Sequence, residues 1–103
     1  MINIDRALRS SIRTGNVVLG SNLALEAGVS GKAKLVISAT DCPEDVAVEL
    51  KKTDVPIYNY SGRGKDLGSA CGKPFSIAAL AVIEPGESEI MALLREIRGI
   101  EDE

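Results

Sequence analysis

Three uninterrupted apolar runs, at residues 17–19, 35–37 and 77–83, constrain the fold of this 103-residue chain most strongly. A strand with one face in water alternates apolar and polar residues, whereas a continuous apolar run is typical of a strand covered on both faces. Segments with helical spacing separate the three runs. This alternation predicts an α/β sandwich, in which helices cover both faces of a small central sheet.

Glycine and proline divide the chain into short helical and extended segments. Gly15 is expected to end the first helix, Gly28 to end the second, and Pro43 to be the first residue of the third. Proline also removes a donor from a strand ladder, so an edge strand is expected at residues 56–60. The expected helices cover about residues 4–14, 21–27, 43–52 and 64–71, and a last amphipathic helix is expected to begin at Ser88.

Charge is distributed unevenly along what is expected to be a single domain, residues 1–103, with a frayed acidic tail at about 99–103. The net charge of −3 by itself argues against a nucleic-acid ligand. However, residues 1–76 carry ten Lys and Arg against eight acids (+2), and residues 77–103 carry two against seven (−5). Because the negative charge belongs to the C-terminal part, the composition does not exclude RNA.

Composition also narrows the chemistry. The sequence contains no His, which excludes imidazole metal sites and His-based catalytic triads. Cys42 and Cys71 form no Cys-x-x-Cys pair and follow no secretory signal, so both are expected to be reduced thiols. The apolar runs are far too short to cross a bilayer. We therefore expect no enzyme activity, no metal, no cofactor and no membrane partner.

A glycine-rich segment from Gly62 to Gly68 follows an expected strand and opens an expected helix, as phosphate-binding loops do. It departs from the phosphate-loop pattern, because Asn59 stands where the first glycine is required and Asp66 replaces the Ser or Thr. Its third glycine also falls one position late for the dinucleotide fingerprint. A small nucleotide-binding protein is therefore retained only as an alternative interpretation.

The segment Gly20-Ser21-Asn22 is a candidate phosphate-binding helix start. A glycine that ends a strand, followed by small polar residues that open a helix, leaves backbone N–H groups at a positive helix end, where phosphate oxygens bind. Asn22 can also offer a donor and an acceptor to a base edge. The alternative is a simple side-chain cap, because Ser and Asn are common in that role.

The segment Lys73-Pro74-Phe75-Ser76 contains the only Phe of the chain. An aromatic ring on a loop is suited to stacking on an unpaired base, and a neighbouring Lys is suited to a phosphate. Phe75 is equally compatible with a place in the core. If residues 20–22, 39–42 and 72–76 lie at the same end of the sheet, they form one surface.

These residues resemble a known family. The closest likeness lies in residues 72–88, and the whole resemblance extends in collinear order over about residues 3–95. The chain resembles the thirty-e family of archaeal and eukaryotic large-subunit ribosomal proteins, within the kink-turn RNA-binding superfamily. Supporting segments are residues 14–20, 31–37, 55–58 and 66–68.

The resemblance implies a three-layer α-β-α sandwich with a small mixed four-stranded sheet, and no catalytic activity. It implies a structural component of the large ribosomal subunit that binds ribosomal RNA at a sharply bent internal loop, contacts neighbouring large-subunit proteins and resides with the ribosome in the cytoplasm. The isolated chain is expected to be monomeric, and a non-ribosomal protein-interaction module of the same fold is the alternative. The RNA contacts that the resemblance implies are Gly20, Ser21, Asn22, Thr40, Asp41, Lys73, Pro74, Phe75 and Ser76.

Overall fold

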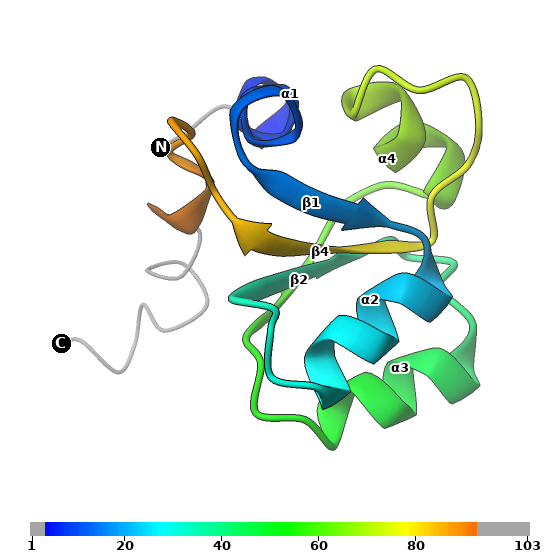
Figure 1. Ribbon diagram of the computed structural model, residues 1–103. Coiled ribbons are helices and arrows are strands. Elements are labelled where there is room, and N and C mark those ends of the chain that lie inside the picture. Colours follow the sequence, from blue (N-terminus) through cyan, green and yellow to red (C-terminus); the bar gives the residue numbers. More distant parts are fainter. Residues whose placement is uncertain (1–3, 93–103) are drawn as a thin grey trace, which may run out of the picture.

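Two layers of helices enclose one four-stranded sheet in the computed structural model, which describes residues 4–92 (Figure 1). Helices α1 and α4 cover one face of the sheet, and α2 and α3 cover the other. The predicted three-layer sandwich is therefore confirmed. In chain order the elements are α1 (Ile4–Thr14), β1 (Asn16–Leu19), α2 (Ser21–Val29), β2 (Leu35–Ser38), α3 (Glu44–Lys51), β3 (Ile57–Asn59), α4 (Gly64–Ala70), β4 (Ala79–Glu84) and the short 3-10 helix η1 (Ile90–Ala92).

The sheet is mixed, with the strand order β1-β4-β2-β3. Strand β4 is antiparallel to both β1 and β2, and β3 is parallel to β2. Leu19 pairs with Leu80, and Ser38 pairs with both Ala79 and Asn59. Strands β1, β2 and β3 therefore all finish where β4 begins. We call this the loop end of the sheet.

Alternate side chains of the apolar runs enter two different cores. Leu35 and Ile37 of β2 pack with α1 and α4, whereas Val36 packs with α2 and α3. The same alternation holds in β4, where Leu80 faces one layer and Ala81 the other. Because successive strand residues point to opposite faces, a strand covered on both sides needs every position apolar.

Tertiary packing changes three of the expected boundaries. Helix α2 continues past Gly28 to Val29, because Gly28 is buried against Thr53 and Val55, and this packing outweighs glycine's weak helix propensity. Pro43 is the N-cap of α3 and not its first residue. The last strand begins at Ala79 and not at 77, because the residues just before it pack against α4.

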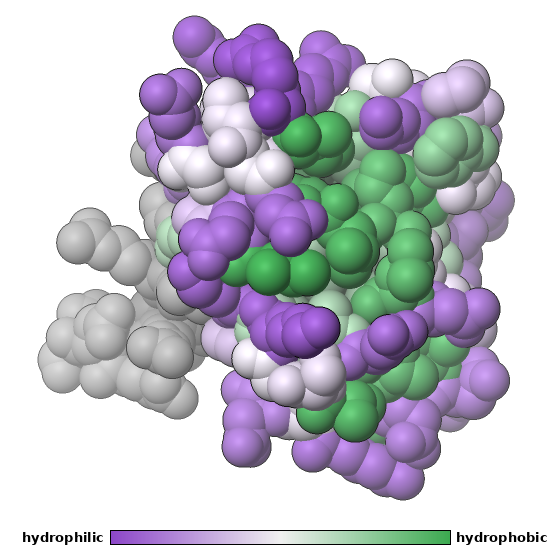
Figure 2. Space-filling view, in the orientation of Figure 1, coloured by the Kyte–Doolittle hydropathy of each residue, from purple (hydrophilic) through white to green (hydrophobic). Residues whose placement is uncertain are grey.

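Strand β1 was expected to be buried, but it forms one edge of the sheet and is only half-buried. Figure 2 shows apolar side chains gathered over the side of the molecule that β1 presents. The predicted edge strand at 56–60 is confirmed as β3. Ser88 Oγ accepts a hydrogen bond from the Ile90 N–H (3.0 Å), as expected of a cap, while residues 93–97 of the predicted last helix and the tail at 99–103 lie outside the described residues.

Candidate nucleic-acid interface

The three segments that the sequence singled out meet at the loop end, on the right of Figure 1. The Gly20 N–H donates to the Ala79 carbonyl (2.9 Å), and the Ala39 N–H donates to the Ala78 carbonyl (2.8 Å). These bonds join the start of α2 and the β2–α3 loop to the residues that follow the 72–76 loop. Three segments that are distant in the sequence thus form one surface.

Helix α2 begins at this surface without a side-chain cap. Its N-cap is Gly20, with φ of +115°, a conformation that favours glycine because other residues are strained there. Ser21 and Asn22 are the first two helical residues, so the alternative of a simple Ser or Asn cap is wrong. Asn22 is exposed, and the first turn of α2 contains no acidic residue. The first-turn N–H groups and the positive end of the helix dipole are left for an anion from outside.

The other two helices that begin at the loop end already have carboxylates. Two acids occupy the first turn of α3. At α4, Asp66 Oδ2 accepts a hydrogen bond from the Arg63 N–H (2.9 Å), and Asp41 Oδ1 accepts one from the Gly64 N–H (2.8 Å). The N–H groups of Arg63 and Gly64, where α4 begins, are therefore already bonded to carboxylates, and α2 is the helix end suited to a phosphate.

Thr40 and Asp41 fasten the β2–α3 loop to the start of α4. The Thr40 Oγ1 hydroxyl donates to the Gly62 carbonyl (3.0 Å), which also accepts the Thr40 N–H (2.8 Å). Asp41 makes the bond to Gly64 described above. Both side chains are exposed but take part in contacts within the protein, so the structure gives them a positioning role at the surface.

Phe75 projects from a loop that is held against α4. Its side chain is 54% exposed, which rules out the alternative of a core residue. The Lys73 N–H donates to the Gly68 carbonyl and the Ile77 N–H to the Gly64 carbonyl, both at 2.9 Å. Gly64 and Gly68 share one face of α4, being four residues apart, and a Cβ at Gly68 would overlap the Phe75 backbone.

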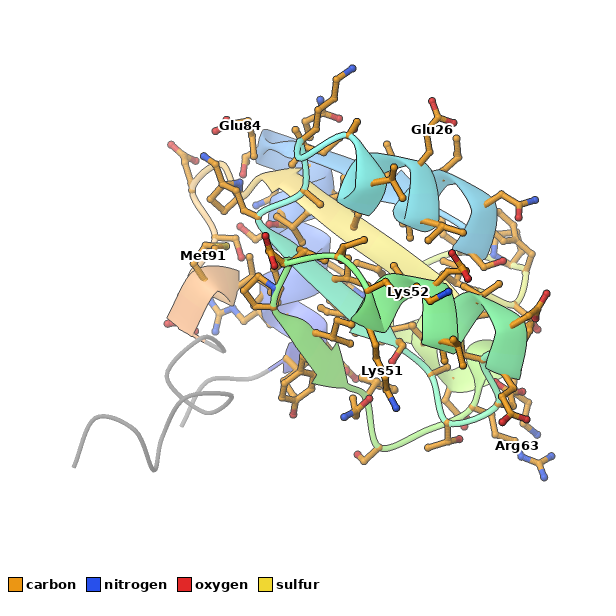
Figure 3. The ribbon with its side chains drawn as sticks, turned by 90° about the horizontal axis from the view of Figure 1, so that it is seen from below. Glu26, Lys51, Lys52, Arg63, Glu84 and Met91 are labelled. Carbon is orange, nitrogen blue, oxygen red and sulfur yellow. The ribbon has the colours of Figure 1, made fainter. Side chains whose placement is uncertain are left out.

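Sequence reasoning missed two cations at this surface. Arg63 and Lys65 are both exposed, and Figure 3 shows the Arg63 side chain extending away from the ribbon. Lys65 and Lys73 line a shallow hollow beside Phe75, together with the residues Ser69, Pro74 and Ser76. The sequence shows both cations, on either side of Gly64 and after an expected strand. It does not show that this segment lies at the loop end, because that position follows from the parallel pairing of β3 with β2.

Reactive side chains are scarce in the described residues. Cys42 and Cys71 are free thiols, as expected, and burial raises the pKa of Cys71 to about 11, so it is protonated at neutral pH. Burial first, and then the hydrogen bond that Tyr60 donates to Asp5 (3.1 Å), raise the pKa of Tyr60 to about 12. Within residues 4–92, no acids or cysteines gather in a group able to hold a metal ion, and no helix is long and apolar enough to span a membrane.

Comparison with known proteins identifies the family. Residues 2–92 match the ribosomal protein L7Ae/L30e/S12e/Gadd45 family. The chain belongs to this family. It is 70% identical to the large ribosomal subunit protein eL30 of Methanothrix thermoacetophila over the whole of both chains. Proteins of the same name from Methanosarcina mazei (43% identical, 88% of each chain) and Methanopyrus kandleri (42% identical, 93% of this chain and 92% of the relative) are also similar, so the resemblance seen in the sequence is confirmed.

Proposed function

We propose that this chain is a structural, non-enzymatic component of the large ribosomal subunit, which binds ribosomal RNA through the loop end at a kink-turn-like internal loop. Its membership of the family and its relatives, named large ribosomal subunit protein eL30, support the ribosomal role. In that role its partners are ribosomal RNA and neighbouring large-subunit proteins, and it resides with the ribosome in the cytoplasm. One observation carries the RNA site: α2 starts at the loop end with no side-chain cap and no acid.

The start of α2 supplies the first RNA contact. The free N–H groups of its first turn, at the positive end of the helix dipole, bind a phosphate of the RNA backbone. Gly20 carries no side chain, and a Cβ there would have no neighbour within 4 Å, so the RNA backbone can approach closely. The Asn22 amide, one residue into the helix, offers a donor and an acceptor to the edge of a purine.

The 72–76 loop supplies the second contact. Phe75 stacks on an unpaired base, and Lys65 and Lys73 neutralise the phosphates on either side of it. In continuous A-form RNA the major groove is too deep and narrow for side chains to read the base edges in it, whereas a bent internal loop exposes unstacked bases. The surface offers one aromatic ring on a fixed loop and one helix end without a cap. It is therefore better suited to a bent internal loop of RNA than to a uniform RNA duplex.

Variants of Asn22 and Phe75, with a variant of Asn16 as the control, test the site. Asn22→Ala and Phe75→Ala should each weaken binding to a kink-turn RNA by about 1–3 kcal/mol, measured by fluorescence anisotropy against a fully paired RNA of equal length. Asn16→Ala is the matched control, because Asn16 is also exposed but begins β1 and so lies at the opposite end of the sheet. Unchanged affinity in both loop-end variants would contradict the site, and equal affinity for both RNAs would contradict the preference for a bend.

Co-sedimentation separates this function from its rival. A ribosomal component travels with large subunits through a sucrose gradient, whereas a protein-interaction module that has lost its RNA role stays at the top. The Phe75→Ala variant should shift part of the protein from the subunit fraction to the free fraction.

A further inference from the structure

A groove runs along the outer surface of the layer formed by α2 and α3, which Figure 3 views from outside. One hollow, lined by Leu25 and Val48 among others, lies towards the loop end. A second hollow, lined by Val29 and Val55, lies at the far end of the two helices. Glu49 lines both hollows, so they adjoin along α3, and we call the two together the groove.

The walls of the groove expose apolar side chains. Val29 on α2 is 70% exposed and Val48 on α3 is 44% exposed. Leu25 and Val29 are four residues apart, so they share one face of α2. Single exposed apolar residues are ordinary, but Val29 and Val48 lie on neighbouring helices and line adjoining hollows, and together they point to a partner.

The rim of the groove is acidic. Its lining contains Glu44, Asp45, Glu49 and Asp54 against one cation, Lys52. Lys52 Nζ already lies 2.9 Å from Glu49 Oε2, so it balances one of those acids. This charge repels RNA phosphates and anionic lipid, and it attracts a cation.

We propose that this groove binds a cationic amphipathic segment of another protein. The apolar side chains of that segment contact Leu25, Val29 and Val48, and its Lys or Arg side chains reach the acidic rim. An eight-residue helix such as α3 is about 12 Å long, which suits a partner helix of two to three turns. The groove adjoins the proposed RNA surface at Asn22, which lines the loop-end hollow, but none of the proposed peptide contacts uses Asn22.

Two other occupants fit less well. Residues 93–103 of the chain itself carry two arginines against four acids, which is the wrong sign. A second copy could offer the arginines of α1, namely Arg6, Arg9 and Arg13. Helix α1 lies in the opposite layer, so such a contact would join unlike faces and propagate instead of closing into a pair.

The test is an NMR titration of the isotope-labelled full chain with a synthetic helical peptide of about 14 residues, with Leu on one face and Lys beside it. Shifts are expected at the amides of the groove. Neutralising the rim with Asp45→Asn and Glu49→Gln together should weaken binding at least tenfold, as should Val48→Ser. Glu26→Gln is the matched control and should change little, because Glu26 is an exposed acid on α2 whose side chain points away from α3 in Figure 3.

Several results would overturn the proposal. Equal binding of a peptide with Glu in place of Lys, or of a scrambled peptide with the same composition, would show that charge and apolar pattern do not act together. Concentration-dependent shifts of the groove amides in the protein alone would assign the groove to a second copy. With kink-turn RNA, shifts at the amides of Val48 and Val55 would assign the groove to RNA, whereas a shift at Asn22 is expected from RNA bound at the loop end. Phe75→Ala should retain peptide binding while the rim variant retains RNA binding, so each proposal can fail alone.

Discussion

Gly68 lies where α4 contacts the loop that carries Phe75, and Gly68→Ala tests how that loop is held. A Cβ at this position would lie 3.0 Å from the Phe75 carbonyl carbon, nearer still to its oxygen, and 3.4 Å from the Ser76 Cα. Carbon atoms in contact are about 3.5–4.0 Å apart, so the contact with the carbonyl carbon alone requires the loop to retreat by about half an ångström, and the closer contact with the carbonyl oxygen requires more. All three neighbours are backbone atoms, which cannot move aside by changing rotamer.

Two opposing effects set the stability of this variant. Alanine gains about 1 kcal/mol of helix propensity over glycine, whereas the forced contact costs about 1–3 kcal/mol. We therefore expect the free energy of unfolding to fall by about 0–2 kcal/mol. Stacking on Phe75 contributes about 1–3 kcal/mol. If its displacement abolishes that stacking, affinity for kink-turn RNA should fall by about 5- to 150-fold.

Gly28→Ala is the matched control, because it is also a buried glycine within a helix. Its Cβ would have its nearest neighbour, a Val55 side-chain carbon, at 3.5 Å, which is ordinary contact. This variant should be more stable by about 1 kcal/mol, with a rise in Tm of about 4–8 °C by circular dichroism, and should bind RNA normally. If Gly68→Ala behaves like Gly28→Ala in both assays while Phe75→Ala loses RNA binding, the contact with α4 does not position Phe75.

Three further results are expected. Asp41→Ala removes the acceptor for the Gly64 N–H and should lower the urea-derived free energy of unfolding by about 0.5–2 kcal/mol, and an unchanged value would contradict the capping role. Folding raises the pKa of Cys71 from 9.0 to about 11 and that of Tyr60 from 10.0 to about 12. Because the folded protein holds both protons more tightly, the contribution of these groups to the free energy of unfolding is complete below about pH 9 and is lost as the pH rises through the folded pKa values. Tm should therefore fall between about pH 9 and 12, and Cys71→Ala should remove the lower part of that fall. RNA affinity should depend weakly on salt, with a log–log slope of magnitude about 2 or less for the three cations Arg63, Lys65 and Lys73, whereas a much steeper slope would require phosphate contacts elsewhere.

The layered fold could be predicted because its cause is local. Each residue of the run at 35–37 is apolar, and the structure shows that neighbours in that run serve two different cores. The pairing order could not be predicted, because nothing in residues 17–19 indicates that, among the described strands, β1 pairs only with β4 and so lies at an edge. Gly28 shows the same limit, since contacts with Thr53 and Val55, distant in sequence, keep it helical.

Part of the candidate site could also be predicted from the sequence, and part could not. Gly20, Ser21 and Asn22 were recognisable as the start of a helix after a strand, and Phe75 as the one aromatic of its kind. The exposure of Phe75 was undecided until the structure showed its loop packed on α4.

By itself, the sequence determined the α/β class, the start of α2 and the family. Strand burial, the start of a helix and similarity to a family all depend on short runs of neighbouring residues. Only the tertiary structure decided that, among the described helices that begin at the loop end, α2 alone has neither a side-chain cap nor a first-turn acid. It also decided that Arg63 and Lys65 join this surface and that an acidic groove lies on another. The physical reason is that charge, exposure and capping depend on which distant segments share a surface, and long-range strand pairing sets that arrangement.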